Sequence, residues 1–193
     1  MKKLLLLIIF SLPVVAFAQE QSIGLRIGEP LSITYKTFIE EKISIEAMIG
    51  RGSANSSTYY RKVFDNNKPA PGAFYLNHSA GGGVSLNGRV AYHEDITAEF
   101  DITEGTLLAF GGAGLQLRSI GLEYAYEEAP DANVVRYESR NNIDFGPEVF
   151  GGAEYYFEEM PISVFAELGL MLEIADRPGH IKLQGGIGAR YIF

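Results

Sequence analysis

The histidines and their neighbours are the first residues to consider for catalysis in this chain. A histidine beside a serine or an acid can act as a general base or activate a nucleophile. The chain has three histidines, His78, His93 and His180. His78 and Ser79 are adjacent, so on a strand their side chains point to opposite faces. His180 and Asp176 fall in a short predicted turn, where we favour a solvated pair. The sequence therefore predicts no catalytic residue.

An acidic run and two glycine-rich segments are the other candidates for binding chemistry. Carboxylates bind calcium when a loop places them at fixed intervals, and this run lacks that spacing. The glycine-rich segments 81–83 and 111–114 do not lie between a strand and a helix, as a phosphate-binding loop would. The histidines are scattered, and the chain has no cysteine. We therefore expect no metal site, no cofactor and no enzymatic activity. The acidic run is Asp95, Glu99, Asp101 and Glu104.

A set of charged residues recurs at alternate positions, on the face opposite the apolar residues. Four bases and four acids enclosed by a narrow sheet must pair, because an unpaired buried charge is very costly. One interpretation is a gated or ion-conducting lumen. The other, which we favour, is a structural plug of salt bridges. The predicted lumen charge network is Arg26, Lys36, Glu46, Arg89, Glu148, Glu154, Glu167 and Arg190.

The segments that position these charges alternate apolar and polar residues with a period of two. This pattern predicts β-strands with one face in an apolar medium. In the last segment Leu183, Ile187, Tyr191 and Phe193 share the apolar face. About eight such segments occur, and a tilted strand of about ten residues is enough to cross a membrane. The predicted strands are 23–28, 32–36, 43–50, 84–93, 107–118, 144–157, 162–173 and 181–193.

Glycines on the inner face indicate that the barrel is small. About eight strands leave an interior just wide enough for side chains to fill, so small residues are needed where long side chains meet. The same size argues against a wide aqueous pore. These glycines are Gly24, Gly28, Gly50, Gly112, Gly114, Gly152, Gly169, Gly186 and Gly188.

Two long connections interrupt the alternation, at about 51–82 and 119–142. We expect each to be a long loop or a hairpin that extends beyond the membrane. Their aromatic residues either form a binding surface or belong to extended hairpins and an aromatic girdle. These aromatic residues are Tyr59, Tyr60, Phe74, Tyr75, Tyr124, Tyr126 and Tyr137.

The first residues predict export. Residues 1–18 begin with Lys2 and Lys3, continue with an apolar core, and end on a small-x-small site with cleavage after Ala18. The apolar run is shorter than the roughly 20 residues of a spanning helix. Removing the leader leaves one barrel domain at 19–193, with 14 basic against 24 acidic residues and a net charge of −10. This charge argues against nucleic-acid binding through a phosphate-neutralising patch.

Three stretches carry a resemblance to a known family: SIGLRIGEPLSITYKTFIEEKISIEAMIG (22–50), GAEYYFEEMPISVFAEL (152–168) and GGIGARYIF (185–193). The chain resembles the small outer-membrane β-barrels of OmpA-like and OmpX-like architecture. The resemblance implies an all-β, antiparallel transmembrane β-barrel of about eight strands in meander order. It also implies a place in the outer membrane of a Gram-negative cell, surrounded by outer-membrane lipid. Tyr191 and Phe193 are then expected to be the signal that the barrel assembly machinery reads.

Three functions remain open under this resemblance. The favoured one is a structural or surface-interaction role, in which the long segments at 51–82 and 119–142 contact an external ligand or surface. The alternative is a narrow, porin-like pore for small solutes or ions. A remote alternative is a lipid-modifying outer-membrane enzyme. The rival fold is a soluble lipocalin-like barrel, which would have an apolar inner face and a polar outer face.

Overall fold

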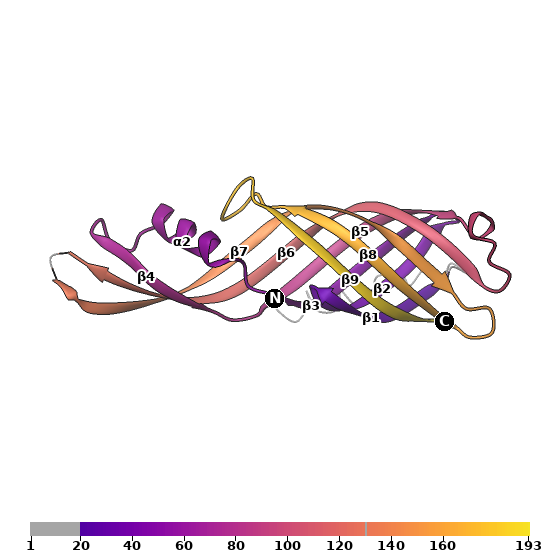
Figure 1. The fold of residues 1–193 in the computed structure, drawn as a ribbon, viewed down its shortest axis with the longest axis horizontal. Coiled ribbons are helices and arrows are strands. Elements are labelled where there is room, and N and C mark those ends of the chain that lie inside the picture. The colour runs from indigo at the N-terminus through magenta and orange to yellow at the C-terminus, as the bar shows by residue number, and fades with distance from the viewer. Residues whose placement is uncertain (1–19, 130) are drawn as a thin grey trace, which may run out of the picture.

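Eight antiparallel strands close into a barrel in this computed structural model, which describes residues 20–129 and 131–193 (Figure 1). The elements are β1 (Gln21–Glu29), β2 (Leu31–Glu40), β3 (Ile43–Gly52), α2 (Ser57–Asn66), β4 (Ala73–Ala80), β5 (Gly83–Asp95), the 3-10 turn η1 (Ala98–Phe100), β6 (Thr106–Glu128), β7 (Asp131–Tyr156), β8 (Ile162–Leu172) and β9 (Ile181–Ile192). Strand β4 lies outside the ring and pairs with β6. The predicted all-β antiparallel barrel in meander order is confirmed. The expected leader at 1–18 lies outside the described residues.

The last strand closes the barrel against the first. Strand β9 pairs with β1, which places Tyr191 opposite Ile23 and Arg190 opposite Gly24. The backbone N–H of Phe193 donates to the carbonyl oxygen of Gln21 at 2.9 Å. The ring therefore has no free sheet edge, which is the condition for strands to lie in hydrocarbon.

The outer wall of the barrel is apolar and the inner wall is polar. Leu183 on the outside is 71% exposed, whereas Arg26 on the inside is 1% exposed. These faces are the reverse of those in a soluble lipocalin-like barrel. An exposed apolar wall of this kind is what a transmembrane barrel presents to lipid.

Glycine is required at inner-wall positions where the backbone and the long side chain of the neighbouring strand leave no room for a Cβ atom. A Cβ on Gly114 would lie 2.5 Å from the carbonyl oxygen of Gly88 and 2.9 Å from Cγ of Arg89. A Cβ on Gly88, whose position faces outward, would meet nothing within 4 Å. Inner-wall glycine therefore makes room for the charged side chains of the lumen.

Strands β6 and β7 continue well beyond the barrel wall. They have 23 and 26 residues. The pairing of β6 with β5 ends at Ser119, and beyond that residue β6 pairs with β4 and β7. Of the two expectations for 119–142, a loop or a hairpin extending beyond the barrel, the structure shows the hairpin, which continues the two barrel strands β6 and β7. Beyond Ser119 the polar residues occupy the outer face and the apolar ones the inner face, so the alternation continues with its phase reversed.

The segment 51–82 forms a helix and a strand, so the expectation of a loop or hairpin was wrong for this segment. Ser56 caps α2 by accepting a hydrogen bond from the backbone N–H of Tyr59 at 3.3 Å. Four of its side chains are buried, at the spacing of one helical face: Tyr59, Tyr60, Val63 and Phe64. No helix within the described ranges is long and apolar enough to cross a membrane.

Helix α2 packs on the extended sheet to form what we call the platform, which comprises α2, β4, residues 119–128 of β6 and residues 131–142 of β7. Figure 1 shows it projecting from one end of the barrel, with Phe193 at the opposite end. Its core contains Tyr59, Tyr60, Phe64, Leu122 and Tyr124. Three of the seven aromatic residues considered either for a binding surface or for extended hairpins and a girdle are therefore core residues.

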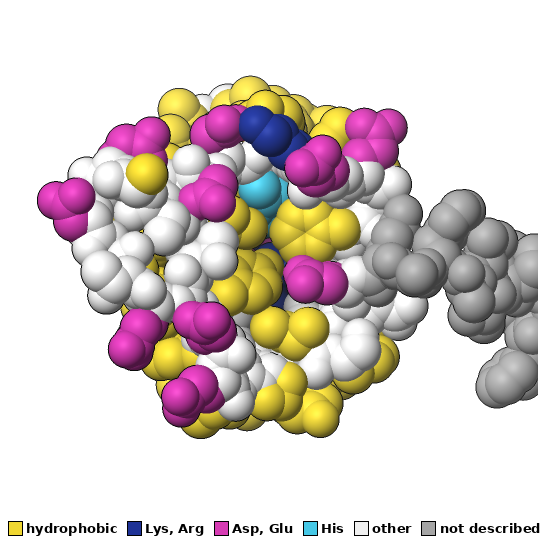
Figure 2. Space-filling model, turned by 90° about the vertical axis from the view of Figure 1, so that its right-hand side faces the viewer, with side chains coloured by type: hydrophobic (Ala, Val, Ile, Leu, Met, Phe, Trp, Pro, Cys, Tyr) yellow, Lys and Arg dark blue, Asp and Glu magenta, His cyan; other side chains and the backbone are white. Residues whose placement is uncertain are grey.

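The opposite end of the barrel carries short connections and an acidic rim. Residues 41–42 join β2 to β3, 96–105 join β5 to β6, and 157–161 join β7 to β8. Figure 2 shows this end, where acidic side chains surround a few central apolar ones. Lys42 forms the one ion pair that the structure gives this rim, to Glu94 at 2.9 Å. The exposed acids of these connections are Glu40, Glu41, Glu94, Asp95, Glu99, Asp101, Glu104, Glu158 and Glu159.

Candidate functional site in the barrel lumen and mouth

All of the predicted lumen charges lie inside the barrel, and none is more than 8% exposed. They come from β1, β2, β3, β5, β7, β8 and β9, and each projects from the inner face of its strand. The period of two explains their common orientation, since residues at alternate positions of a strand share a face. The structure therefore brings these residues together in one compartment.

One half of the lumen network centres on Glu167. Its Oε1 atom accepts from Nε of Arg26 and from Nη1 of Arg89, both at 2.7 Å. Nε of Arg89 also donates to Glu148 at 2.8 Å. The guanidinium of Arg89 lies 4.4 Å from the ring centroid of Phe150, so an aromatic face covers the cation.

The other half centres on Arg190. Its guanidinium donates to Glu46 at 2.5 Å and lies 2.8 Å from Glu154. Glu154 also accepts from Nζ of Lys36 at 2.5 Å. Arg89 and Glu46, separated by 3.8 Å, connect this half to the first. The four cations and four anions are therefore joined through ion pairs into one network.

An aromatic group lies beyond the network, toward the end with the acidic rim. The ring of His93 lies 4.8 Å from Phe38 and 5.6 Å from Phe110, measured between centroids. His93 is buried, and its Nε2 is 2.8 Å from the hydroxyl oxygen of Ser44. This histidine therefore packs inside the lumen and has a hydrogen-bond partner.

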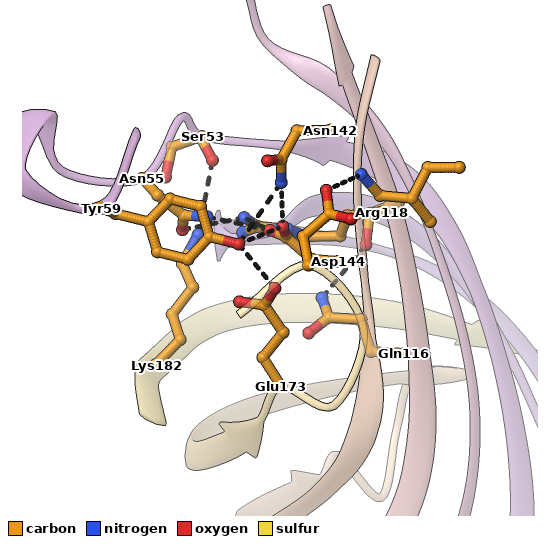
Figure 3. Close-up of polar contacts among 12 residues, drawn as sticks. Ser53, Asn55, Tyr59, Gln116, Arg118, Asn142, Asp144, Glu173 and Lys182 are labelled. Atoms are coloured by element: carbon orange, nitrogen blue, oxygen red, sulfur yellow. Dashed lines mark hydrogen bonds and ion pairs between the residues drawn. The ribbon is translucent and has the colours of Figure 1, made fainter. Parts of the chain in front are cut away.

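A second polar cluster closes the lumen beneath the platform, and we call it the mouth cluster (Figure 3). Arg118 is fully buried and donates through Nε to Asp144 at 3.1 Å and through Nη1 to Glu29 at 2.9 Å. Lys182 donates to the same Glu29 oxygen at 2.7 Å. The cluster consists of Glu29, Asn55, Tyr59, Arg118, Asn142, Asp144, Glu173 and Lys182.

Helix α2 joins the mouth cluster through Tyr59. Its hydroxyl oxygen lies 2.6 Å from Oε1 of Glu173 and 3.0 Å from Oδ1 of Asp144. A single hydroxyl proton cannot be donated to both carboxylates at once. Burial raises the pKa of Glu173 to about 6. Below that pH Glu173 is protonated and can donate to Tyr59 while Tyr59 donates to Asp144; above it the two carboxylates share one hydroxyl proton.

The sequence carries a signal for the mouth cluster. Arg118, Asp144 and Glu173 all fall on the predicted inner faces, outside the predicted charge network. Arg118 and Asp144 lie directly opposite each other on β6 and β7. Tyr59 lies in a predicted loop or hairpin, and the pattern gives no sign of the helix that carries it to the lumen.

The structure separates the pairs that could have suggested catalysis. His78 accompanies Tyr124 on the side of β4 that faces α2, whereas Ser79 pairs with Glu123 on the other side. Asp176 accepts from the backbone N–H of Ile143 at 2.8 Å. The ring of His180 instead lies 5.0 Å from that of Tyr59. Among residues 20–129 and 131–193, no group of three or more His, Asp or Glu side chains is placed to hold a metal ion.

Comparison with known proteins gives matches in structure only. No family model and no curated protein matches this sequence. The chain is similar to the N-terminal β-barrel domain of OprF from Pseudomonas aeruginosa, with a TM-score of 0.53 and 11% identity over 91% of this chain and 96% of that one. A major outer membrane protein from Thermus thermophilus gives 0.48 and 12%, over 92% and 100% of the two chains. Ail, the attachment invasion locus protein of Yersinia pestis, gives 0.44 and 10%, over 91% and 93%.

The likeness to the OprF domain is a likeness of fold. Both chains are covered almost completely, and the strands of this chain close into a ring with an apolar outer wall and a charged lumen. The chain therefore has the fold of the small outer-membrane β-barrels.

Proposed function

We propose that this protein spans the outer membrane as a closed barrel and acts at the cell surface through the platform. The apolar outer wall supports the membrane placement, since such a wall is costly to expose to water. The platform lies on the side of the longer connections, which in this class of barrel face outward. The proposed role is structural support combined with contact to an external ligand or surface.

The observation that carries this proposal is the exposed face of the platform. Phe74 on β4 and Tyr137 on β7 are 59% and 69% exposed, on the side of the sheet that α2 does not cover. Aromatic side chains of this kind are enriched at protein interfaces. The ion pairs of the lumen and the mouth cluster leave the barrel interior filled. A contact surface therefore fits the geometry better than a passage.

Cysteine labelling tests the orientation, because the chain has no cysteine of its own. A Ser139→Cys variant should react with a membrane-impermeant maleimide in intact cells. A Glu99→Cys variant, at the acidic rim, should react only after the outer membrane is permeabilised. Labelling of Glu99→Cys but not Ser139→Cys in intact cells would reverse the proposed orientation.

Photo-cross-linking tests the contact role. A benzoylphenylalanine at Tyr137 should give a discrete adduct in cells, whereas the same residue at Glu99 provides the matched control at the other end. Adducts that are equally abundant at both sites, or absent at every platform position, would argue against a surface-contact function.

The narrow pore is the second candidate, and the mouth cluster is the observation that favours it. A passage would require α2 to leave the mouth, and the proton shared by Tyr59 and Glu173 offers a way to control that step. Steady single-channel steps in planar bilayers would support the pore. We propose no enzymatic role, and the lipid A mass spectra of cells with and without the protein should then be identical.

Export and assembly complete the proposal. Cleavage after Ala18 would give a mature protein whose N-terminal sequence begins at Gln19, which Edman sequencing can check. Tyr191 and Phe193 are exposed on and just beyond the closing strand, where a receptor can reach them. We propose that these residues are the contact for the barrel assembly machinery.

A further inference from the structure

We propose that a cavity on the platform binds a small organic cation, specifically a primary ammonium with a short apolar group. The cavity has a volume of about 230 Å³ and lies between α2, the outer part of the β6–β7 sheet and the loop that joins β8 to β9. It is lined by Val63, Leu122, Tyr124, Arg140, Asn142 and Asp176. The inference does not depend on the surface-contact function.

A ligand in this cavity must first supply a hydrogen-bond donor to the Oδ1 atom of Asn142. This side chain is 2% exposed, and its Oδ1 atom has no hydrogen-bond partner. Its amide nitrogen donates to Asp144 and to the hydroxyl oxygen of Tyr59, as Figure 3 shows. Exchanging the two amide atoms would place the oxygen against a carboxylate, so the orientation is fixed. A buried acceptor left unpaired costs free energy that a donating ligand would recover.

The second requirement is a positive charge for Asp176. Its Oδ2 atom accepts from the backbone N–H of Ile143, and none of the ion pairs in the described part of the chain includes its carboxylate. Arg140 does not compensate it, because that guanidinium donates to Glu138 at 2.8 Å and to the carbonyl oxygen of Asn67 at 2.5 Å. Arg177 is directed elsewhere, 5.4 Å from the ring of Tyr59.

The rest of the wall defines the remainder of the ligand. Val63, Leu122 and Tyr124 are buried and present apolar and aromatic surface. An ammonium can donate to both Asn142 and Asp176, while its apolar group packs on this surface. An anion would lie against an unpaired carboxylate, and a neutral alcohol would leave the charge uncompensated. The volume is below the roughly 300–1,000 Å³ of sites for drug-sized ligands, so the ligand must be small.

Calorimetry with the detergent-refolded full chain tests this site. The probe is phenethylammonium, and 2-phenylethanol is its neutral control on the same protein. We expect a saturable heat with the ammonium that is absent with the alcohol, after subtraction of the heat of mixing with empty micelles. Asp176→Asn, which retains an oxygen for Ile143, should weaken binding at least about tenfold.

Glu123→Gln is the matched control variant, because it removes one exposed carboxylate from the other side of the same sheet. It should bind as the wild type does. Equal binding of the alcohol, an unchanged affinity in Asp176→Asn, or no saturation by about 10 mM ammonium would overturn the proposal. A crystal soaked in phenethylammonium that shows only water at Asn142 would also overturn it.

Discussion

Replacement of Arg190 by methionine tests whether the lumen network stabilises the barrel. Arg190 donates to Glu46 at 2.5 Å, lies 2.8 Å from Glu154, and stacks 3.7 Å from the ring centroid of Phe165. Methionine keeps most of the apolar stem and removes the charge. Glu154 would keep Lys36 at 2.5 Å, but the nearest cation to Glu46 would then be Arg89 at 3.8 Å.

The expected loss follows from leaving Glu46 buried with only the longer ion pair to Arg89, at 3.8 Å. Removing one member of a buried ion pair costs about 3–5 kcal/mol, because the remaining charge is uncompensated. That loss corresponds to roughly two to three and a half powers of ten in the unfolding equilibrium. Replacing Glu46 by glutamine as well removes the uncompensated charge, so the double variant should be more stable than the single one.

Urea unfolding in lipid vesicles measures these free energies, and the gel mobility of unheated and heated samples gives an independent check. The four proteins of the cycle are wild type, Arg190→Met, Glu46→Gln and the double variant. A loss below about 1 kcal/mol for Arg190→Met, as for an exposed pair, would refute the reasoning. A double variant no more stable than Arg190→Met would refute it too.

Three further outcomes follow from the mouth, the glycines and the closing strand. Burial raises the pKa of Glu173 from 4.5 to about 6. The contact between α2 and the mouth should therefore be strongest below pH 4.5. It should lose about 2 kcal/mol as the pH rises through 6. Amide exchange of α2 should show this loss, and Glu173→Gln should abolish it; an unchanged pH profile in the variant would contradict the assignment. Gly114→Ala should destabilise the barrel by about 1–3 kcal/mol in urea, while Gly88→Ala, whose Cβ meets open space, should not, and equal effects would count against the packing argument. Deleting Phe193 should lower the fraction of heat-modifiable protein in the membrane, and full assembly would remove its proposed role.

The two-residue period of side-chain direction in a strand explains why the barrel and the lumen face could be predicted from the sequence. A residue on a strand faces either in or out, so a single choice of phase orients every charge of that strand. Partners could not be predicted, because Arg26 of β1 meets Glu167 of β8, two strands away in the ring. Such contacts depend on strand tilt and stagger, which the sequence pattern does not specify.

The packing of the platform could not be predicted because the apolar residues move there from the outer face of the strands to the inner face. Along the outer parts of β6 and β7, polar residues such as Glu123 and Ser139 occupy the outer face, so the lipid-facing pattern stops. The apolar residues continue on the inner face as Leu122 and Tyr124, where α2 covers them. Helix α2 itself has ten residues, too few for periodicity alone to decide between a helix and a loop.

The acidic rim at the end of the barrel that holds Phe193 has a consequence for insertion into a bilayer. Its carboxylates are exposed, and one ion pair, between Lys42 and Glu94, offsets part of their charge. Each ionised side chain that enters hydrocarbon is costly, so these turns stay on the side from which the chain arrives. In the platform, Arg136 and Arg140 form ion pairs with Glu128 and Glu138, which compensate part of its charge. We therefore expect insertion to have a direction, with the platform crossing first and the acidic turns opposing reversal.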